Sequence, residues 1–438
     1  VEHWHRPPPH APTESIMLRP CPITAASASV LAALCLATTA ARSATAQATA
    51  SRAPAITYRT MPIDIEARPR DPLPVRGDDG RRFVVYTLLV TNWGDRDLRL
   101  ASVEVRGGDD ARLLLVRYDS AALEDPLRQR SILAGALRRG PDNRLLPPGR
   151  TALLTVGVAF DSAAAPPSAL RHRVVFEPDT GVALVSDDGT LTRELAALSE
   201  PLPLGRSEPV VLGPPLRGGP WRCGNGLSYT SAHEALYTFR TARLRTPQRY
   251  GCDFYKVDSA GSILPNPFPD TISNAMFYGY GAEVLAVADA RVAYAKDGVP
   301  ENVPRADGGI AMPVPLTNET VSGNWVSLDL GNGRYAFYAH LQPGSIRVTT
   351  GQRVRRGDVI GLLGNAGNSV GPHLHFHVGD RNALNESVAV PYVFDAFRFY
   401  GRGRPAQGSV RAGGTAKRRA LPLGDAVIGF PAGTARAR

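Results

Sequence analysis

Gly371-Pro-His-Leu-His-Phe-His-Val378 is the stretch from which both the fold and the chemistry of this chain can be inferred, and it holds three of the nine histidines. Side chains alternate between the two faces of a β-strand, so His373, His375 and His377 share one face. The apolar residues between them face the other way and can pack into a core. Two such histidines have Cα atoms roughly 6.7 Å apart, close enough for both imidazoles to meet at one metal ion. The pattern therefore favours a catalytic or metal site over a merely solvated strand face.

The composition is typical of a folded protein, and the length allows more than one domain. The chain has 438 residues, of which 43% are hydrophobic and 21% are charged, enough for two or three domains. Its formal charge of +10 suits an anionic partner such as cell wall or lipid, or else reflects a coding bias towards Arg. No nucleic-acid-binding motif accompanies the charge, so we expect no nucleic-acid partner.

The amino-terminal residues have the pattern of an export signal. A short basic segment begins at Met17, an apolar run extends from Ile23 to Ala40, and small-residue cleavage sites follow between Ala44 and Ala48. We therefore predict a pre-sequence and signal peptide over 1–48, with translation starting at Met17. The mature protein would be exported to the periplasm, the cell envelope or the medium, with no stable membrane span after cleavage.

Two cysteines, Cys223 and Cys252, remain in the predicted mature chain. An exported chain with two cysteines can join them in a disulfide, and two buried free thiols are the alternative. We favour the disulfide.

The residues after the signal predict a first β-domain and a linker. Short strand patterns broken by turn residues, such as Phe83–Thr91 and Thr151–Val158, predict an immunoglobulin-like β-sandwich over 50–211. The Pro- and Gly-rich stretch 212–220 is predicted to be the linker to the next domain.

A second domain of antiparallel β-structure is predicted over 221–400, so the fold class is mainly β. Gly331-Asn-Gly333 lies between two strand patterns and is a strong hairpin signal. The segments 255–277 and 297–322 are long enough to be walls of a substrate groove. The Arg-, Gly- and Ala-rich segment 401–438 is predicted to be a flexible basic tail.

A catalytic zinc ion needs three protein ligands and one open position for water. Because carboxylates bind zinc alongside imidazoles, Asp253, at the start of an apolar stretch, is a candidate ligand. Strand spacing alone leaves open whether the pair His373/His375 or the pair His375/His377 faces the metal.

Four Gly- and His-containing motifs stand out in the second domain: Gly281–Asp289, Tyr338–Leu341, Val354–Gly361 and Gly364–Phe376. They resemble the LytM/lysostaphin-type zinc endopeptidases, which cut peptidoglycan peptides. Together these motifs are highly specific, although they cover a minority of the chain. The resemblance implies a LytM-type peptidase domain whose substrate is peptidoglycan or another peptide.

The resemblance also implies roles for individual residues. His375 would bind Zn²⁺, while His340 and His373 would be catalytic, orienting water and stabilising the oxyanion. His377 stands where the family usually has Glu, and we assign it no role. The activity implied is zinc-dependent endopeptidase cleavage of peptidoglycan cross-links or stem peptides.

The chain departs from the family at Arg249. The family usually has a His ligand four residues before the Asp, whereas an arginine stays protonated and cannot bind zinc. His233, in an upstream segment, is the candidate replacement, and the chain is similar to a branch of the family with an upstream His and a Gln-Arg-Tyr/Phe-x-x-Asp element. The alternative is a catalytically degenerate LytM-like domain that binds cell wall or activates another wall hydrolase. We favour the enzyme because the other site residues are all present.

Overall fold

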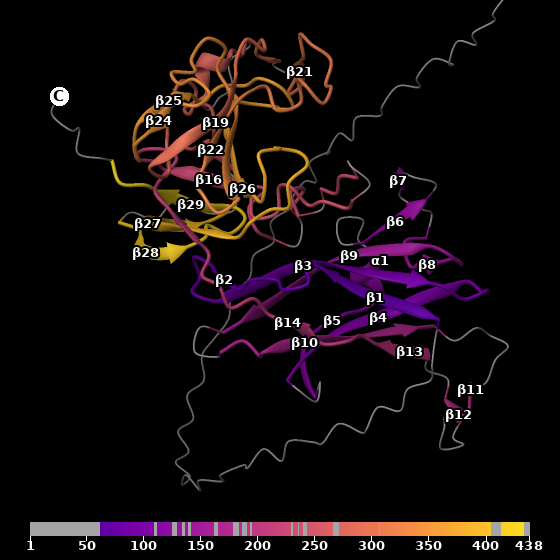
Figure 1. Ribbon diagram of the computed structural model, residues 1–438. Helices are drawn as coiled ribbons and strands as arrows, with labels where there is room; N and C mark the ends of the chain where they lie inside the picture. The colour runs from indigo at the N-terminus through magenta and orange to yellow at the C-terminus, as the bar shows by residue number, and fades with distance from the viewer. Residues whose placement is uncertain are drawn as a thin grey trace, which may run out of the picture. The chain divides into compact units, whose positions relative to one another are not determined.

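The computed structural model describes residues 62–108, 112–124, 129–133, 136–138, 142–161, 165–177, 184–185, 191–192, 195–228, 231–234, 236–239, 243–265, 271–305, 307–403 and 413–432. The regular elements of this part are strands, apart from the short helix α1 (Ser120–Glu124) and the 3-10 turn η2 (Asn274–Met276). The predicted mainly-β fold class is thus confirmed (Figure 1). Within the described residues, no helix has the length and apolar character that crossing a membrane requires. The predicted signal peptide lies outside the described residues.

The first part of the described chain consists of short antiparallel strands. They are β1 (Ile63–Arg68), β2 (Val75–Arg76), β3 (Arg82–Asn92), β4 (Leu98–Gly107), β5 (Leu113–Tyr118), β6 (Gln129–Leu133), β7 (Ala136–Arg138), β8 (Leu145–Leu146), β9 (Thr151–Phe160), β10 (Ala169–Phe176), β11 (Leu184–Val185), β12 (Leu191–Thr192), β13 (Leu195–Leu198) and β14 (Leu202–Pro203). One sheet has the order β1-β3-β9-β6-β7, with β2 beside β3. A second sheet has the order β13-β10-β4-β5, with β14 and β8 attached to it, while β11 and β12 pair with each other.

These two sheets share one hydrophobic core. Tyr86 and Leu88 on β3 are buried with Val156 on β9, and they pack with Val103 on β4 and Val174 on β10. β-Branched and aromatic residues favour such half-buried pleated surfaces. The two sheets therefore form a sandwich around a common core. Its immunoglobulin-like topology stays a prediction.

The second part is built on one large sheet. Its strands are β15 (Val210–Leu212), β16 (Trp221–Gly224), β17 (Cys252–Lys256), β19 (Ala290–Lys296), β22 (Asn324–Asp329), β23 (Tyr335–Leu341), β24 (Arg353–Val354), β26 (Leu374–Gly379), β27 (Tyr392–Arg402), β28 (Thr415–Ala420) and β29 (Ala426–Gly429). The order is β15-β27-β29-β16-β17-β26-β23-β22-β19-β24, with β28 paired to β27. Smaller ladders join β18 (Glu283–Leu285) to β25 (Val359–Leu362) and β20 (Val303–Pro304) to β21 (Ile310–Ala311). Every pair in the large sheet is antiparallel except β15 with β27.

The histidine strand β26 lies between β17 and β23 in this sheet. Its Leu374, Phe376 and Val378 are fully buried in the core of the second part, as the alternating pattern predicts. In the register, His375 is directly opposite Asp253 on β17 and Ala339 on β23. Directly opposite residues point to the same face of a sheet. The pairing therefore brings the Asp253 carboxylate to the histidine face.

The hairpin predicted around Gly331-Asn-Gly333 joins β22 to β23. All three turn residues have positive φ, from 53° at Asn332 to 83° at Gly331. Glycine and asparagine tolerate this left-handed backbone, which is why the motif marks a tight turn.

The linker predicted over 212–220 is wrong as a description of this stretch. Leu212 ends strand β15, which pairs with β27, and Leu216 is completely buried in the core of the second part. Proline and glycine in this stretch shape a chain that runs along the domain. Composition reports turns, but it does not report whether the residues between them are buried.

The flexible tail predicted over 401–438 is also wrong where the structure describes it. β27 extends to Arg402, and residues 415–429 supply β28 and β29. β29 pairs with both β16 and β27, and Ile428 and Phe430 are buried. The described residues of this segment are therefore part of the large sheet.

Candidate active site

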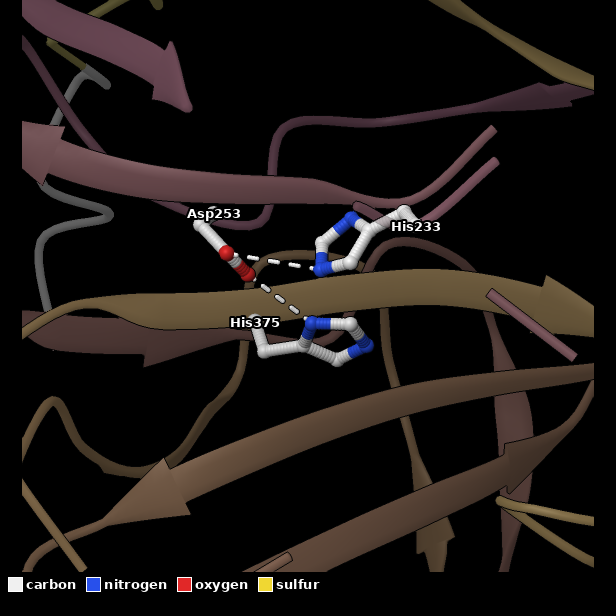
Figure 2. A group of neighbouring side chains, drawn as sticks. All are labelled: His233, Asp253 and His375. Carbon is white, nitrogen blue, oxygen red and sulfur yellow. Dashed lines mark hydrogen bonds and ion pairs between the residues drawn. The ribbon is translucent and has the colours of Figure 1, made fainter. Parts of the chain in front are cut away.

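Three polar side chains from separate segments meet on the histidine face of the large sheet (Figure 2). The Asp253 carboxylate lies between two imidazoles, with Oδ1 2.9 Å from Nδ1 of His375 and Oδ2 3.4 Å from Nε2 of His233. All three residues are buried, and their potential ligand atoms lie within 4.8 Å of one another. The structure thus brings the three predicted ligands together, including His233 from the upstream segment.

This cluster fits a zinc ion. Two imidazoles and one carboxylate are donors that zinc accepts in tetrahedral sites. Ligand atoms about 2.0–2.1 Å from a tetrahedral zinc stand roughly 3.4 Å apart, and the His233–Asp253 distance is 3.4 Å. The cluster also lines an open cavity, which leaves one side for a non-protein ligand. That the three residues bind a metal stays a prediction.

Electrostatics act differently on the three residues of the cluster: burial lowers the pKa of His233, but the Asp253 charge and hydrogen bond outweigh this effect and raise that pKa. Burial raises the pKa of Asp253, but His233 and His373 outweigh this effect and hold that pKa well below its usual range. Burial lowers the pKa of His375, despite its hydrogen bond to Asp253. The Asp253 carboxylate is therefore ionised, and a metal bound by the two imidazoles would displace the hydrogens that they direct at it.

Local hydrogen bonds hold Asp253 and the His233 segment in place. Asn225 donates from Nδ2 to Oδ2 of Asp253 at 2.8 Å. Ser231 donates to the carbonyl oxygen of Asn225 at 2.6 Å, and the backbone N–H of His233 donates to Oγ of Ser231 at 3.2 Å. A Cβ atom at Gly251 would lie 3.1 Å from Nδ1 of His233, so glycine there allows the close approach of the two segments.

Arg249, which stands where the family has a ligand, forms a buried ion pair. Its Nε lies 3.2 Å from Oε2 of Glu234, and its Nη2 donates to Oγ1 of Thr87 at 2.9 Å. The backbone N–H of Tyr250 donates to Oε1 of the same glutamate at 3.3 Å. Because Glu234 directly follows His233, the pair ties the His233 segment to the turn that precedes Asp253.

Breaking this ion pair should destabilise the protein. Replacing Arg249 with Met leaves the Glu234 carboxylate buried without its counter-ion, and we expect a loss of about 3–5 kcal/mol in the free energy of unfolding. Chemical denaturation followed by circular dichroism measures it. The double variant Arg249→Met/Glu234→Gln removes both charges and should recover part of the loss. An unchanged denaturation midpoint in Arg249→Met would contradict the assigned role.

The two predicted catalytic histidines expose the same ring nitrogen to the cluster. Nδ1 of His340 lies 2.7 Å from the carbonyl oxygen of Ala366, and Nδ1 of His373 lies 2.8 Å from that of Gly371. Since a carbonyl oxygen only accepts, each Nδ1 carries the ring hydrogen in a neutral imidazole. In the neutral rings the lone pair is then on Nε2, and Nε2 of His373 lies 3.5 Å from Oδ1 of Asp253.

Both rings are held rigidly. Their centroids are 4.8 Å apart, and the Tyr255 ring stacks on His373 with a centroid distance of 4.7 Å. His340 has a φ of +67°, an uncommon left-handed conformation for a residue with a side chain, of the kind found at functional sites. Burial, followed by the charges of His373 and His375, holds the pKa of His340 well below its usual range, so its ring is neutral near pH 7.

A cavity of about 580 Å³ opens over the cluster. Besides the five predicted site residues, its lining includes Leu316, Val321 and Ser322 from the predicted groove segment 297–322. The other predicted wall, 255–277, contributes Tyr255. Apolar and neutral polar side chains around a buried polar cluster are the usual composition of a ligand site.

Sequence reasoning missed several residues that support the cluster. Asn225 holds Asp253, Glu234 holds Arg249, and His377 lies with its Nδ1 2.9 Å from Nε2 of His375. These contacts arise from strand pairing and from segments that fold back onto the large sheet, so no local sequence pattern predicts them. Of these three missed residues, only His377 had a sequence signal, which was the period-two spacing of the histidines.

The predicted pair of cysteines is joined in the structure. Cys223 on β16 and Cys252 on β17 form a disulfide with a Cα–Cα distance of 5.3 Å, within the usual range for such bonds. Cys252 adjoins Asp253, so the bridge links the neighbouring strand to the carboxylate of the cluster.

Comparison with known proteins identifies a peptidase domain. Residues 274–386 match the sequence model of peptidase family M23. This segment contains His340, His373 and His375, and it begins downstream of Asp253. The resemblance to LytM/lysostaphin-type peptidases that the sequence motifs predict is thus confirmed for this part of the chain.

Two curated relatives come from Vibrio cholerae serotype O1 (strain ATCC 39315 / El Tor Inaba N16961). The peptidoglycan DD-endopeptidase ShyA is 39% identical over 80 residues, which are 18% of this chain and 18% of the relative. The peptidoglycan DD-endopeptidase ShyC is 42% identical over 55 residues, which are 13% of this chain and 12% of the relative. The chain therefore covers less than a fifth of the length of these relatives.

Two solved peptidase structures are also similar to parts of this chain. The catalytic domain of lysostaphin from Staphylococcus simulans is 19% identical, with 40% of this chain and 88% of that chain covered and a TM-score of 0.21. A putative M23 peptidase from Pseudomonas aeruginosa is 16% identical, with 60% and 85% covered and a TM-score of 0.21.

Proposed function

We propose that this protein is an exported zinc-dependent endopeptidase that hydrolyses peptide bonds in peptidoglycan cross-links or stem peptides. The observation that carries the proposal is the buried cluster of His233, Asp253 and His375 beside His340 and His373, at one open cavity. The M23 match and the DD-endopeptidase relatives support a peptidase acting on peptidoglycan. An exported location follows from that substrate and from the predicted signal peptide.

Zinc is the cofactor that suits the donor set, with His233, Asp253 and His375 as its ligands. When bound, it supplies a Lewis acid and a water whose pKa is lowered to about 7. The remaining chemistry falls to protein groups. His340 and His373 both line the cavity, where Nε2 of each ring would accept a proton from water.

Proton transfer by these two histidines would complete hydrolysis. An imidazole that has accepted a proton donates a hydrogen bond to the oxyanion of the tetrahedral intermediate, and it then passes the proton to the leaving amine. The Nδ1 hydrogen bonds to Ala366 and Gly371 keep both rings oriented through this cycle. The lowered pKa keeps the His340 ring neutral near pH 7, so its Nε2 can accept a hydrogen bond from water.

A catalytically degenerate LytM-like domain that binds cell wall or activates another hydrolase is the second candidate function. Arg249 at the position of a family ligand is the observation that favours it. Purified full-length protein, loaded with zinc, distinguishes the two candidates when it is incubated with purified peptidoglycan sacculi and the released muropeptides are separated by chromatography. New uncrosslinked muropeptides support the peptidase, whereas retention on sacculi without cleavage supports the binding domain.

Replacing His340 with Ala should separate metal binding from catalysis. Because His340 is not among the three proposed ligands, we expect near wild-type zinc content and a fall of about 10²–10⁴ in the cleavage rate, the usual contribution of a general acid–base group. Zinc content by mass spectrometry and muropeptide release from sacculi give the two quantities. Loss of zinc in this variant would instead make His340 a ligand.

A further inference from the structure

We propose that His377 is a positioning residue for the metal ligand His375. With a metal bound, its Nδ1 would accept a hydrogen bond from Nε2–H of His375, and this bond would present the other ring nitrogen of His375 to the metal. The inference rests on the proposed function, because it concerns a ligand of the proposed zinc site. It gives a role to a histidine that stands where the related peptidases usually have Glu.

The geometry of the two rings carries the argument. Nε2 of His375 lies 2.9 Å from Nδ1 of His377, while Nδ1 of His375 faces Asp253 at 2.9 Å. His375 therefore has one nitrogen in the cluster and the other on His377. His377 is fully buried, and its ring stacks on Phe337 with centroids 4.8 Å apart and an interplanar angle of 24°. The stack fixes the plane in which the Nδ1 lone pair of His377 points.

Only one arrangement of hydrogens is compatible with a metal on Nδ1 of His375. A neutral imidazole carries a single hydrogen, so a lone pair on Nδ1 requires the hydrogen on Nε2. Nε2–H then needs an acceptor, and Nδ1 of His377 is the atom placed to receive it. Without a metal, Nδ1 of His375 donates its hydrogen to the Asp253 carboxylate, and Nε2 then accepts from His377. Metal binding to Nδ1 would move the ring hydrogen of His375 to Nε2 and reverse the bond to His377.

Packing alone does not account for a histidine at this position. The site is buried against Phe337, where an apolar side chain would fill the space without bringing in polar nitrogens. Second-sphere groups that fix the tautomer of a histidine ligand are worth about 10–100-fold in metal affinity. A histidine that supplies such an acceptor offsets the cost of burying its ring nitrogens.

Two substitutions in the full-length protein separate the acceptor from the bulk of the side chain. In Asn, the side-chain oxygen stands close to where Nδ1 of His stands, so His377→Asn keeps an acceptor, whereas His377→Leu fills space without one. We expect His377→Leu to weaken zinc affinity by about 10–100-fold and His377→Asn to stay within a few-fold of wild type. Competition with a chromophoric chelator measures the affinities, and thermal denaturation shows whether each variant is folded.

A measurement on the wild-type protein does not depend on the variants folding. Nitrogen-15 NMR of the zinc-loaded protein should show the hydrogen of His375 on Nε2 and the lone pair of its Nδ1 on zinc. The opposite assignment, or equal zinc affinity in a folded His377→Leu, would overturn the inference while leaving the zinc site intact. Wild-type protein that binds no zinc would overturn the proposed function, and the inference with it.

Discussion

Replacing His233 with Ala is expected to remove both zinc and hydrolytic activity, as completely as His375→Ala does. Arg249 cannot act as a ligand, because it is protonated and paired with Glu234. Without His233 the cluster keeps one carboxylate and one imidazole, and two protein ligands hold zinc poorly compared with three. Metal content after dialysis and muropeptide release from sacculi are the measurements.

A buried histidine outside the cluster gives the matched control. His172 is buried in the sandwich, where its Nε2 lies 2.6 Å from the Tyr86 hydroxyl oxygen. His172→Asn should lower stability while leaving zinc content at the wild-type level, because none of the proposed ligands is changed. Full zinc occupancy and activity in His233→Ala would remove His233 from the ligand set, and the peptidase would then need another third ligand.

The part of the fold that the sequence predicts best is the part in which local pattern and tertiary contacts agree. On β26 the apolar residues Leu374, Phe376 and Val378 alternate with histidines, and burial follows that alternation. The glycine turn at 331–333 requires positive φ, which few other residues tolerate, so the hairpin was evident as well. Side-chain alternation and the need for positive φ each depend on only a few neighbouring residues, so both can be recognised in the sequence.

The residue types of the candidate site could be predicted from the sequence, but the contacts between these residues could not. The family motifs point to His340, His373 and His375, and Asp253 follows from the same resemblance. His233 reaches the cluster because its segment folds back, and Glu234 fixes that fold by pairing with Arg249, fifteen residues further along the chain. This ion pair forms only in the tertiary structure. In the sequence alone, Arg249 shows only that the usual His ligand is missing at this position.

The carboxyl-terminal segment shows how composition misleads. Lys417, Arg418 and Arg419 suggest a solvated chain, and several glycines flank them. The charged side chains belong to β28, where Arg418 and Arg419 are exposed while Ala420 is buried. The following strand β29 is only four residues long, too short for a periodic signal. β29 is buried because it lies between β16 and β27 in the large sheet.

We therefore expect deletion of residues 413–438 to prevent the protein from folding. The deletion removes β28 and also β29, which lies between β16 and β27 in the large sheet. Leu421, Ile428 and Phe430 are buried there, and each large apolar side chain contributes about 1.5–3 kcal/mol on burial. Losing them together is comparable with the whole stability of a typical domain, about 5–15 kcal/mol. The exposed backbone edges of β16 and β27 would also promote aggregation.

Point substitutions make the same prediction in graded form. Phe430→Ala opens a cavity in the core and should lower the free energy of unfolding by about 3–5 kcal/mol, whereas Arg418→Ala on the exposed face of β28 should change it by less than about 0.5 kcal/mol. Soluble yield, far-ultraviolet circular dichroism and the melting temperature measure the effects. A truncated protein that melts at the wild-type temperature would show that this segment is the dispensable tail its composition suggests. Because β16 adjoins β17, which carries Asp253, loss of β29 should also reach the metal cluster, so a folded remnant is expected to bind zinc less tightly.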